Sequence, residues 1–291
     1  MYKSRKEILI YGAPGILLVL LFVYYPLVLN FINSFYRWNA FSPSRLFVGL
    51  ENFKRLLNDP IIFRAFINNT LYAIFSVIFQ CGLGLVFAAI LENKVFSKYQ
   101  GFFRTVYFVP AVISLTVIGL LWQFVYHPMY GIVNPFLKLI GLGGLASDWL
   151  GKSSTAIYAV IFVSQWQNIG YIMLLFIVAI QKIPAEVYES AKIDGATGIK
   201  GFFYITIPLV KEMTLVTTVI TVIGAYKVFS EVYVMTAGGP GHATETLVTY
   251  MYRVGFRNDE MGYASAISAL IFVVLLILTL VQLKISKTNT K

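Results

Sequence analysis

The chain has 291 residues, of which 58% are hydrophobic and only 12% are charged. A soluble domain carries about 25% charged residues, so this composition excludes an ordinary soluble domain and predicts an integral membrane protein. The net charge of +10 comes from short clusters between apolar runs, a distribution that indicates membrane topology rather than nucleic-acid binding. The single cysteine, Cys81, lies in an apolar run without Cys or His neighbours, so no disulfide or metal site is expected.

The apolar runs are long enough for six transmembrane helices. A helix that crosses the bilayer needs about 20 mostly apolar residues. Six stretches meet this requirement, at residues 9–29, 70–91, 106–126, 156–180, 213–235 and 263–283. No small-x-small cleavage site follows the first run, so we expect it to be retained as a span rather than removed as a signal peptide. The sequence therefore predicts an all-α membrane protein, with residues 1–291 forming a single transmembrane domain.

The basic residues favour a cytoplasmic location for both termini. Six spans leave the two termini on the same side of the membrane. If that side is the cytoplasm, 13 basic residues lie inside and nine lie outside. An excess of Lys and Arg marks the cytoplasmic side of membrane proteins. We therefore expect the N-in, C-in orientation.

Prolines interrupt two of the predicted spans. Pro14 and Pro26 lie in the first span, and Pro110 lies in the third. A proline inside a helix lacks the amide that would bond the preceding turn, and it bends the helix. Both spans are therefore expected to be kinked.

The segment between the first two spans has the pattern of a short amphipathic helix. Apolar residues recur at helical spacing from Leu50 to Leu57, and the Asn-Asp-Pro run at 58–60 predicts the end of the helix. Such a helix would lie at the outer membrane interface. The alternative is a helix that is simply solvated.

The polar insert between the fourth and fifth spans predicts two short helices joined by a glycine. Pro184 is expected to open the first helix, because its missing amide would be unpaired there in any case. Glu186 and Glu189 follow in the first turns, where the helix dipole favours acidic groups. Gly195 is expected to end this helix in a left-handed conformation. Loops of this length, residues 184–210, are uncommon unless they have a function.

This insert resembles a loop of a known family. Its residues match the EAA loop of the permeases of binding-protein-dependent ABC importers at Glu189, Ala191, Gly195, Ile205, Ile207 and Pro208. Ser190 departs from the family pattern, which has an alanine there. Asp194, Gly195 and Ala196 supply an extension typical of sugar permeases. Further matches at 228–241, 244–247 and 262–266 extend the resemblance over nearly the whole chain, with maltose-type and multiple-sugar permeases as the nearest group.

The resemblance implies a type I ABC importer permease fold and a role for the insert. In that family the loop is a coupling helix that sits in a cleft of a cytoplasmic ATPase subunit. Glu189 would then pair with a basic residue of the ATPase, and Gly195 would provide the elbow that lets the helix enter the cleft. The coupling residues implied in this sequence are Glu189, Ser190, Ala191, Asp194, Gly195 and Ala196.

Polar residues in the fourth and fifth spans predict the path of a substrate. Polar groups within spans are costly and tend to face the interior of a helix bundle. Matched to the maltose-type relatives, the implied sugar contacts are Gln167, Asn168, Tyr171, Thr221, Gly224, Ala225 and Val228. The alternative is that these amides and hydroxyls only join the helices to one another by hydrogen bonds.

Two charged residues lie in the fifth span. Lys227 and Glu231 are four residues apart, so one helical face would carry both and an intramembrane ion pair is expected. Substrate contact and a proton relay are the alternatives.

The predicted function is that of a permease subunit rather than an enzyme. The sequence has no phosphate-binding loop, and His127 and His242 are isolated, so neither a bound cofactor nor a metal is expected. The resemblance implies import of a sugar, specifically an oligosaccharide, across a bacterial plasma (inner) membrane. It also implies a cytoplasmic ATPase dimer that uses ATP-Mg, a second permease subunit in a heterodimer, and an extracellular solute-binding protein. The sugar and the lipid bilayer are the remaining expected partners. Nucleic acid is not expected as a partner. The alternatives are glycerol phosphate or a polyol as cargo, or a proton-coupled secondary transporter, which the lack of an internal repeat disfavours.

Overall fold

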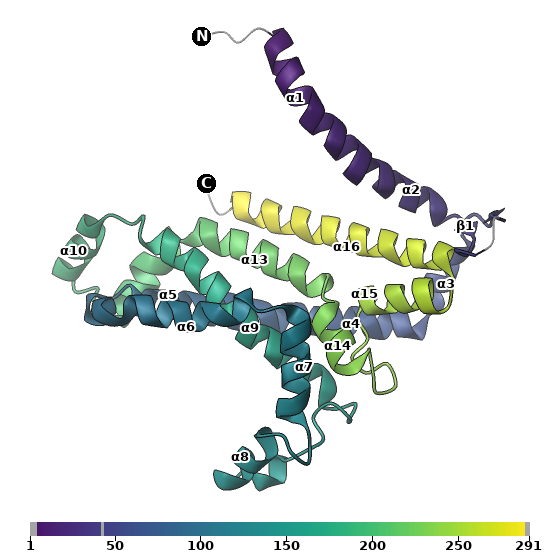
Figure 1. Cartoon of the computed structure of the whole chain (residues 1–291). Coiled ribbons are helices and arrows are strands. Elements are labelled where there is room, and N and C mark those ends of the chain that lie inside the picture. Colours follow the sequence, from purple (N-terminus) through teal and green to yellow (C-terminus); the bar gives the residue numbers. More distant parts are fainter. Residues whose placement is uncertain (1–4, 42–43, 289–291) are drawn as a thin grey trace. The chain divides into compact units, whose positions relative to one another are not determined.

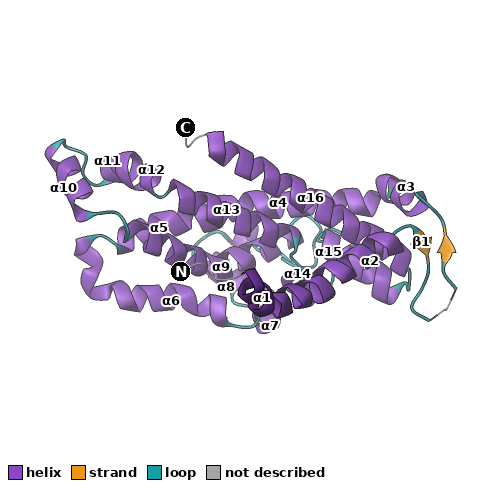
Figure 2. Cartoon of the chain, turned by 90° about the horizontal axis from the view of Figure 1, so that it is seen from above, coloured by secondary structure: helices purple, strands orange, loops and turns teal. Residues whose placement is uncertain are grey.

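The computed structural model describes residues 5–41 and 44–288, and these are predominantly helical (Figures 1 and 2). A short antiparallel pair of strands, β1 (Tyr36–Arg37) and β2 (Leu46–Phe47), lies in the segment between the first two spans. The chain forms two compact units, one of Met1–Ile62 with Tyr250–Val274 and one of Phe63–Thr249 with Leu275–Lys291. We describe each unit by itself.

The first unit holds the N-terminal helices and the beginning of the last one. Its elements are α1 (Arg5–Val19), a π-helical turn (Leu20–Tyr24), α2 (Tyr25–Asn33), the two strands, α3 (Glu51–Asn58), the first residues of α4 (Pro60–Ser76), the end of α15 (Leu247–Tyr252), a π-helical turn (Arg253–Arg257) and the first half of α16 (Met261–Thr288).

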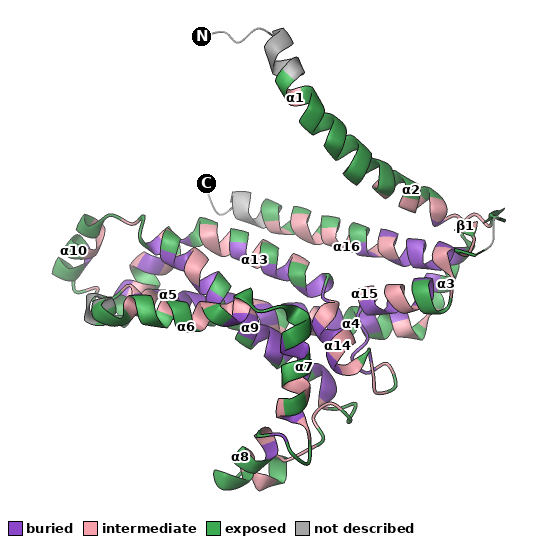
Figure 3. Cartoon of the chain, viewed as in Figure 1, coloured by how far each residue is buried: buried purple, intermediate pink, exposed green. Residues whose placement is uncertain are grey.

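Together α1 and α2 make an apolar helix that is exposed along most of its length and contacts α16 through Asn30 and Phe31 near its end. The stretch Tyr11–Asn33 is long and apolar enough to cross a membrane, and none of it is buried, as Figure 3 shows. The helix departs from α geometry at the π-helical turn Leu20–Tyr24, directly before Pro26. Proline has no amide to donate, so the local change in hydrogen bonding falls where the sequence predicts a disturbance.

The short helix predicted after the first span is confirmed as α3, which ends at Asn58 as expected. Asp59 then adopts an extended backbone, and its carboxylate accepts hydrogen bonds of 2.7 Å from the hydroxyls of Tyr250 and Tyr263. Arg55 forms an ion pair of 2.7 Å with Glu260 and lies 4.0 Å above the ring of Tyr263. These contacts tie α3 to the beginning of α16.

The second unit contains most of the remaining helices. After the body of α4 come a π-helical turn (Val77–Leu83), α5 (Gly84–Leu91), a 3₁₀ turn (Lys94–Tyr99), α6 (Gln100–Val112), α7 (Leu115–Tyr126), α8 (Val133–Leu139), a 3₁₀ turn (Gly143–Leu145), α9 (Ala156–Ile180), α10 (Ala185–Ile193), α11 (Ile199–Gly201), a π-helical turn (Phe202–Thr206), α12 (Ile207–Leu209), α13 (Lys211–Tyr226) and α14 (Ser230–Thr236).

Helix α9 lies at the centre of this unit and is buried along most of its length (Figure 3). Its residues Met173 and Phe176 are fully buried and pack against Ala88 of α5. Gly170 lets α6 approach closely, because a Cβ at this position would lie 1.8 Å from the carbonyl oxygen of Tyr107. Small residues permit such close helix crossings in membrane proteins.

The third predicted span, 106–126, is not a single helix. Helix α6 ends at Val112, α7 begins at Leu115, and their axes differ by 97°. Pro110 lies in the last turn of α6, and Ile113 and Ser114 are extended, so the chain leaves helical geometry just after the proline. The kink expected at Pro110 is confirmed, and residues 106–126 form one span only if the bent pair α6–α7 is counted as one.

The fifth predicted span is also interrupted, at Lys227–Phe229 between α13 and α14. Side chains from elsewhere in the unit hold this break. Asn69 of α4 is fully buried; its Nδ2 donates to the carbonyl of Ala225 at 2.7 Å and its Oδ1 accepts from the amide of Leu247 at 2.9 Å. Thr246 donates to the carbonyl of Val228 at 3.1 Å. A broken helix survives at membrane depth when the freed backbone groups find such partners.

Five stretches of the described chain are long and apolar enough to cross a membrane, and six if the bent pair α6–α7 counts as one span. The five are Tyr11–Asn33, Pro60–Leu91, Ala156–Ile180, Lys211–Thr236 and Met261–Lys284. The predicted all-α membrane class is therefore confirmed. The N-in, C-in orientation and the single transmembrane domain stay predictions.

The hydrogen bonds that Asp59 accepts from Tyr250 and Tyr263 predict that the stability of the protein depends on pH. Burial would raise the pKa of Asp59, but hydrogen bonds from Tyr250, Tyr263 and two backbone amides outweigh it and hold the pKa below the ordinary 3.8. The stabilisation is then fully present above the ordinary pKa and is lost as the pH falls through the lowered one. We expect Asp59→Asn to lower the melting temperature in detergent at about pH 7 and to flatten its decline towards about pH 3. An unchanged melting temperature and pH profile would show that these hydrogen bonds contribute nothing to the stability of the folded protein.

Asn69 predicts a large loss of stability on truncation. Asn69→Ala leaves the buried carbonyl of Ala225 and the amide of Leu247 without this partner, which costs about 1–3 kcal/mol for each unsatisfied group. Asn58→Ala is the matched control, since Asn58 also bonds a carbonyl but is exposed. The melting temperature of the purified protein should fall by several degrees for Asn69→Ala and not for Asn58→Ala. Equal falls in the two variants would contradict the stabilising role of Asn69 at the helix break.

Candidate functional site

The polar insert forms two short helical arms joined by a turn, as the sequence predicts. Helix α10 begins after Pro184 and ends at Ile193. Gly195 has φ +75°, and the amides of Gly195 and Ala196 bond the carbonyls of Lys192 and Ala191 at 3.1 and 2.8 Å. This is a Schellman motif, in which glycine is favoured because its backbone is left-handed. The expected glycine elbow is confirmed as a local structure.

The insert presents both charged and apolar side chains to its surroundings. Glu189, Ser190, Asp194 and Gly195 are exposed and Ala196 is partly exposed. The nearby apolar side chains of Ile193, Ile199 and Tyr204 are 89%, 78% and 74% exposed. Ala191 differs from the other predicted coupling residues, because it is buried and packs within the chain itself. An exposed mixed surface of this kind is typical of an interaction site.

The second arm of the insert is packed onto the core of the unit. The hydroxyls of Tyr188 and Thr206 lie 3.0 Å apart and join the two arms. Phe202 and Val210 then pack in the same hydrophobic cluster as Ile177 at the end of α9. The second arm of the insert is therefore packed directly against the end of α9.

A polar clamp lies beside this junction. Glu92 at the end of α5 forms an ion pair with Arg104 of α6 and accepts a hydrogen bond of 3.2 Å from Gln181, which follows α9. The side chains of Glu92 and Arg104 are 15% and 29% exposed, so solvent screens the pair less than an open surface pair. The clamp joins three helix ends next to the insert.

A second candidate region is a polar cavity of about 420 Å³ within the same unit. Its walls come from α4, the π-helical turn after it, α7, α9, α13 and α14. The polar and charged side chains that line it are Tyr72, Ser76, Gln80, Ser164, Asn168, Tyr171, Thr221, Lys227, Ser230 and Glu231. Its volume lies within the usual range for pockets that bind small molecules.

Six of the seven predicted path residues line this cavity, namely Asn168, Tyr171, Thr221, Gly224, Ala225 and Val228. Gln167 is the exception: it is buried away from the cavity, and its Nε2 donates to the carbonyl of Ile113 at 3.4 Å. The neighbouring Asn168 faces the cavity because successive residues of a helix point about 100° apart. Gln167 is therefore an interhelical contact at the α6–α7 bend, and the geometry gives no support for its contact with a substrate.

The expected placement of Lys227 and Glu231 on one helical face is wrong. Lys227 follows the last residue of α13, and Glu231 lies in the first turn of α14, on the other side of the break. Among the residues that the structure describes, no ion pair within 4.0 Å joins the two. Both nevertheless line the polar cavity, with Lys227 exposed and Glu231 6% exposed.

The contribution of α4 to the cavity was not predicted from the sequence. Tyr72, Ser76 and Gln80 all line it, and the Ser76 hydroxyl accepts from Gln80 at 3.4 Å and from Gln165 of α9 at 3.2 Å. These three residues are spaced four apart in an apolar span, so they form one polar stripe along a helix. That spacing is visible in the sequence and was the available signal.

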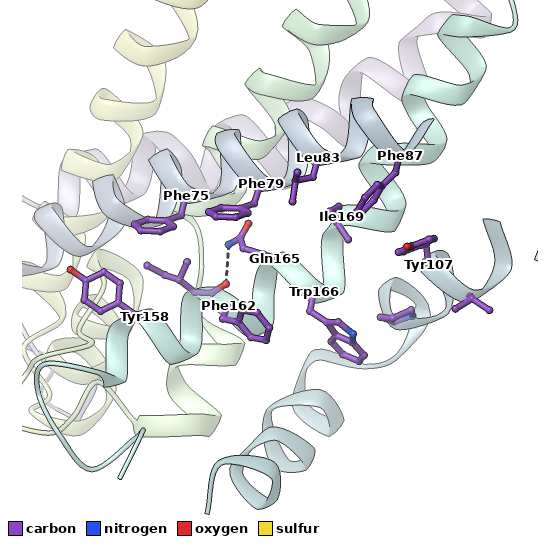
Figure 4. A pocket seen from close by; sticks show the side chains of 13 residues that line it. Phe75, Phe79, Leu83, Phe87, Tyr107, Tyr158, Phe162, Gln165, Trp166 and Ile169 are labelled. Carbon is purple, nitrogen blue, oxygen red and sulfur yellow. Dashed lines mark hydrogen bonds between the residues drawn. The ribbon is translucent and has the colours of Figure 1, made fainter. Parts of the chain in front are cut away.

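A larger hollow, of about 560 Å³, lies on another side of α4 and α9 and is almost wholly apolar (Figure 4). Phe75, Phe79, Phe162 and Trp166 are among its lining residues. Gln165 is its single amide side chain, and that amide nitrogen is already bonded to Ile161 and Ser76. Such a groove suits apolar partners, so the smaller polar cavity is the better candidate for a hydrophilic cargo. Within the described chain, no group of three or more His, Cys, Asp or Glu residues is placed to hold a metal ion.

Comparison with known proteins gives close relatives along nearly the full chain. Residues 81–288 match the family described as "Binding-protein-dependent transport system inner membrane component". The chain is 50% identical over 273 residues to the probable ABC transporter permease protein YurN of Bacillus subtilis (strain 168), covering 94% of each chain. It is 34% identical to the arabinooligosaccharides transport system permease protein AraP of Halalkalibacterium halodurans, covering 97% of this chain and 88% of the relative.

A solved structure has the same fold. A chain of a bacterial ABC transporter involved in the import of the acidic polysaccharide alginate superposes with a TM-score of 0.85 and 24% identity, over 99% of this chain and 98% of that one. The likeness shows that the two chains share a fold. The family match and the similarity to an ABC transporter permease show that the chain is a transport component rather than an enzyme. The chain belongs to the family of inner membrane components of binding-protein-dependent transport systems.

Proposed function

We propose that this chain is the permease subunit of an ATP-driven ABC importer that moves an oligosaccharide into the cytoplasm. The polar cavity among the membrane-spanning helices carries the proposal about cargo. Its hydroxyls and amides match the hydrogen-bonding groups of a sugar, and the 41% exposed Tyr171 offers its ring to the apolar face of a sugar ring. The similarity to an arabinooligosaccharide permease supports the same class of cargo.

The exposed insert is the proposed docking point for a cytoplasmic ATPase dimer. The ATPase would hydrolyse ATP-Mg, since this chain is a transport component. Glu189 lies on the exposed side of α10, where its carboxylate is free to meet a basic side chain of the ATPase. The exposed apolar side chains of Ile193 and Ile199 would add hydrophobic contacts from which water is excluded. Packing of the second arm onto α9 provides the route by which closure of the ATPases would reach the cavity.

Two further partners complete the proposed importer. An extracellular solute-binding protein would deliver the sugar, as the description of the family implies. A second permease subunit would close the cavity from the other side and form a heterodimer with this chain. The uncovered apolar surface of Tyr11–Asn33 supports a neighbour of this kind or direct contact with lipid.

Substitutions in the insert are predicted to weaken coupling to the ATPase while leaving the amount of this protein in the membrane unchanged. Glu189→Ala should weaken ATPase binding by about 10- to 100-fold, since a charge-assisted hydrogen bond contributes about 1.5–3 kcal/mol. Gly195→Asp should act in the same direction, because a side chain is strained at φ +75°. Glu212→Ala is the control, an exposed acidic residue outside the insert. Co-purification of the ATPase and uptake of labelled sugar should both fall for the first two variants only. Normal co-purification with both would overturn the docking role.

The energy source gives a separate test of the function. Uptake into proteoliposomes that contain the whole assembly should require ATP-Mg inside and the binding protein outside, and should be insensitive to a proton uncoupler. Uptake by this chain alone, driven by a proton gradient, would contradict the proposal and support a secondary transporter.

A further inference from the structure

We propose that the polar clamp of Glu92, Arg104 and Gln181 makes the ends of α5, α6 and α9 beside the insert move as one body, so that Arg104 is a positioning residue for the coupling of ATP hydrolysis to transport. The inference rests on the proposed docking of an ATPase on the insert, residues 184–210. It adds residues outside the insert to the route between that surface and the polar cavity.

The clamp lies directly beside the hydrophobic cluster against which the insert packs. Leu91 at the end of α5 and Ile180 at the end of α9 are buried in this cluster, together with Val210 of the insert. Glu92 and Gln181 are the next residues in the chain, and the hydrogen bond of 3.2 Å between their side chains joins the two helix ends. In Figures 1 and 2, α10 lies at this same end of the unit. Polar contacts therefore close the junction that apolar contacts fill.

Helix α6 depends on the clamp more than its neighbours do. Pro110, in its last turn, is the one buried residue of α6, all of which the structure describes. The first half of α6 is attached by the ion pair of Arg104 with Glu92 and by Gln100, whose Nε2 donates to the last carbonyl of α5 at 2.5 Å. Tyr107 packs against the hydrophobic cluster but is only partly buried. Polar contacts thus hold the end of α6 beside the insert, whereas α5 and α9 are held there by buried apolar side chains.

Helix α6 leads from this junction to the wall of the polar cavity. The bend that follows α6 is joined to α9 by Gln167, whose Nε2 donates to the carbonyl of Ile113 at 3.4 Å. Helix α7 then begins with Leu115, which lines the cavity. With the clamp intact, a displacement of the insert carries α6 and α9 together. Without Arg104, α9 still follows the insert, but the end of α6 is released and the bend is displaced less.

The test measures the distance between α6 and α9 in the purified importer, assembled with its ATPase and second permease in lipid nanodiscs. In a Cys81→Ser background, spin labels are placed at Phe102 of α6 and Val178 of α9, which are both exposed. Pulsed electron paramagnetic resonance gives the distance between the labels without nucleotide and with ATP-Mg and vanadate. We expect nucleotide to leave this distance unchanged in the labelled background, because the two helices move together. In Arg104→Gln the distance should change with nucleotide.

Coupling provides a readout that a purely structural role would not move. Proteoliposomes that hold the whole assembly, with ATP-Mg inside and the binding protein outside, are given labelled arabinotriose or maltotriose. Arg104→Gln should lower the sugar taken up per ATP hydrolysed by about 2- to 30-fold, the range over which residues between two coupled sites alter coupling. The ATPase should still co-purify, because the docking surface is intact. Arg104→Lys keeps the charge and should retain more of the coupling than Arg104→Gln.

Two further variants separate coupling from folding. Gln181→Ala removes only the hydrogen bond to Glu92, and Gln181 is exposed, so the melting temperature should stay unchanged while the α6–α9 distance responds to nucleotide. Lys98→Gln is the matched control, since Lys98 is an exposed basic residue two positions before α6. It should change neither the response of the distance nor the coupling.

A distance that responds to nucleotide in the same way in the labelled background and in Arg104→Gln would overturn the inference and leave the proposed function standing. A wild-type assembly that lacks the ATPase, or that hydrolyses no ATP, would overturn the proposed function itself and the inference with it.

Discussion

Asn69 uses both ends of its amide, and the geometry of the polar cavity depends on those two hydrogen bonds. One joins α4 to the last turn of α13 through the carbonyl of Ala225, and the other joins α4 to the amide of Leu247. In a bilayer the backbone groups freed by a helix break have no water to bond. With these groups satisfied from α4, the chain can stop at Tyr226 and restart at Ser230, which turns Glu231 into the cavity.

One helix connects this cavity to the insert, residues 184–210. The middle of α9 supplies Asn168 and Tyr171 to the cavity, and its last turns pack with Phe202 and Val210 of the insert. The close crossing at Gly170 fixes α6 against the same helix. Because packed interiors behave as rigid networks, a force applied to the insert moves the cavity wall rather than being absorbed between them. This arrangement provides the mechanical link that the proposed docking of an ATPase on the insert requires.

Local features of the sequence predicted the insert well, whereas tertiary contacts determined the details of the cavity. The helix start at Pro184 and the glycine at 195 act through their own backbone conformations, so the sequence alone identifies them. The break after Lys227 has no such signal, because the residues around it are compatible with a continuous helix and the partners that hold it come from α4 and Thr246. The same reasoning explains Gln167, which shares a polar run with Asn168 but faces α6. Tyr72, Ser76 and Gln80 recur every four residues in the sequence, so their shared position on the cavity wall could have been predicted from that spacing.

The central claim is that the polar cavity, and not the larger apolar groove beside it, holds the cargo. Electron cryo-microscopy of the assembled importer, with its sugar trapped by a non-hydrolysable ATP analogue, tests this most directly. Density for a sugar ring in contact with Asn168 and Tyr171 is the expected result. Sugar density in the aromatic groove of Phe79 and Trp166, with the polar cavity filled only by solvent, would contradict it.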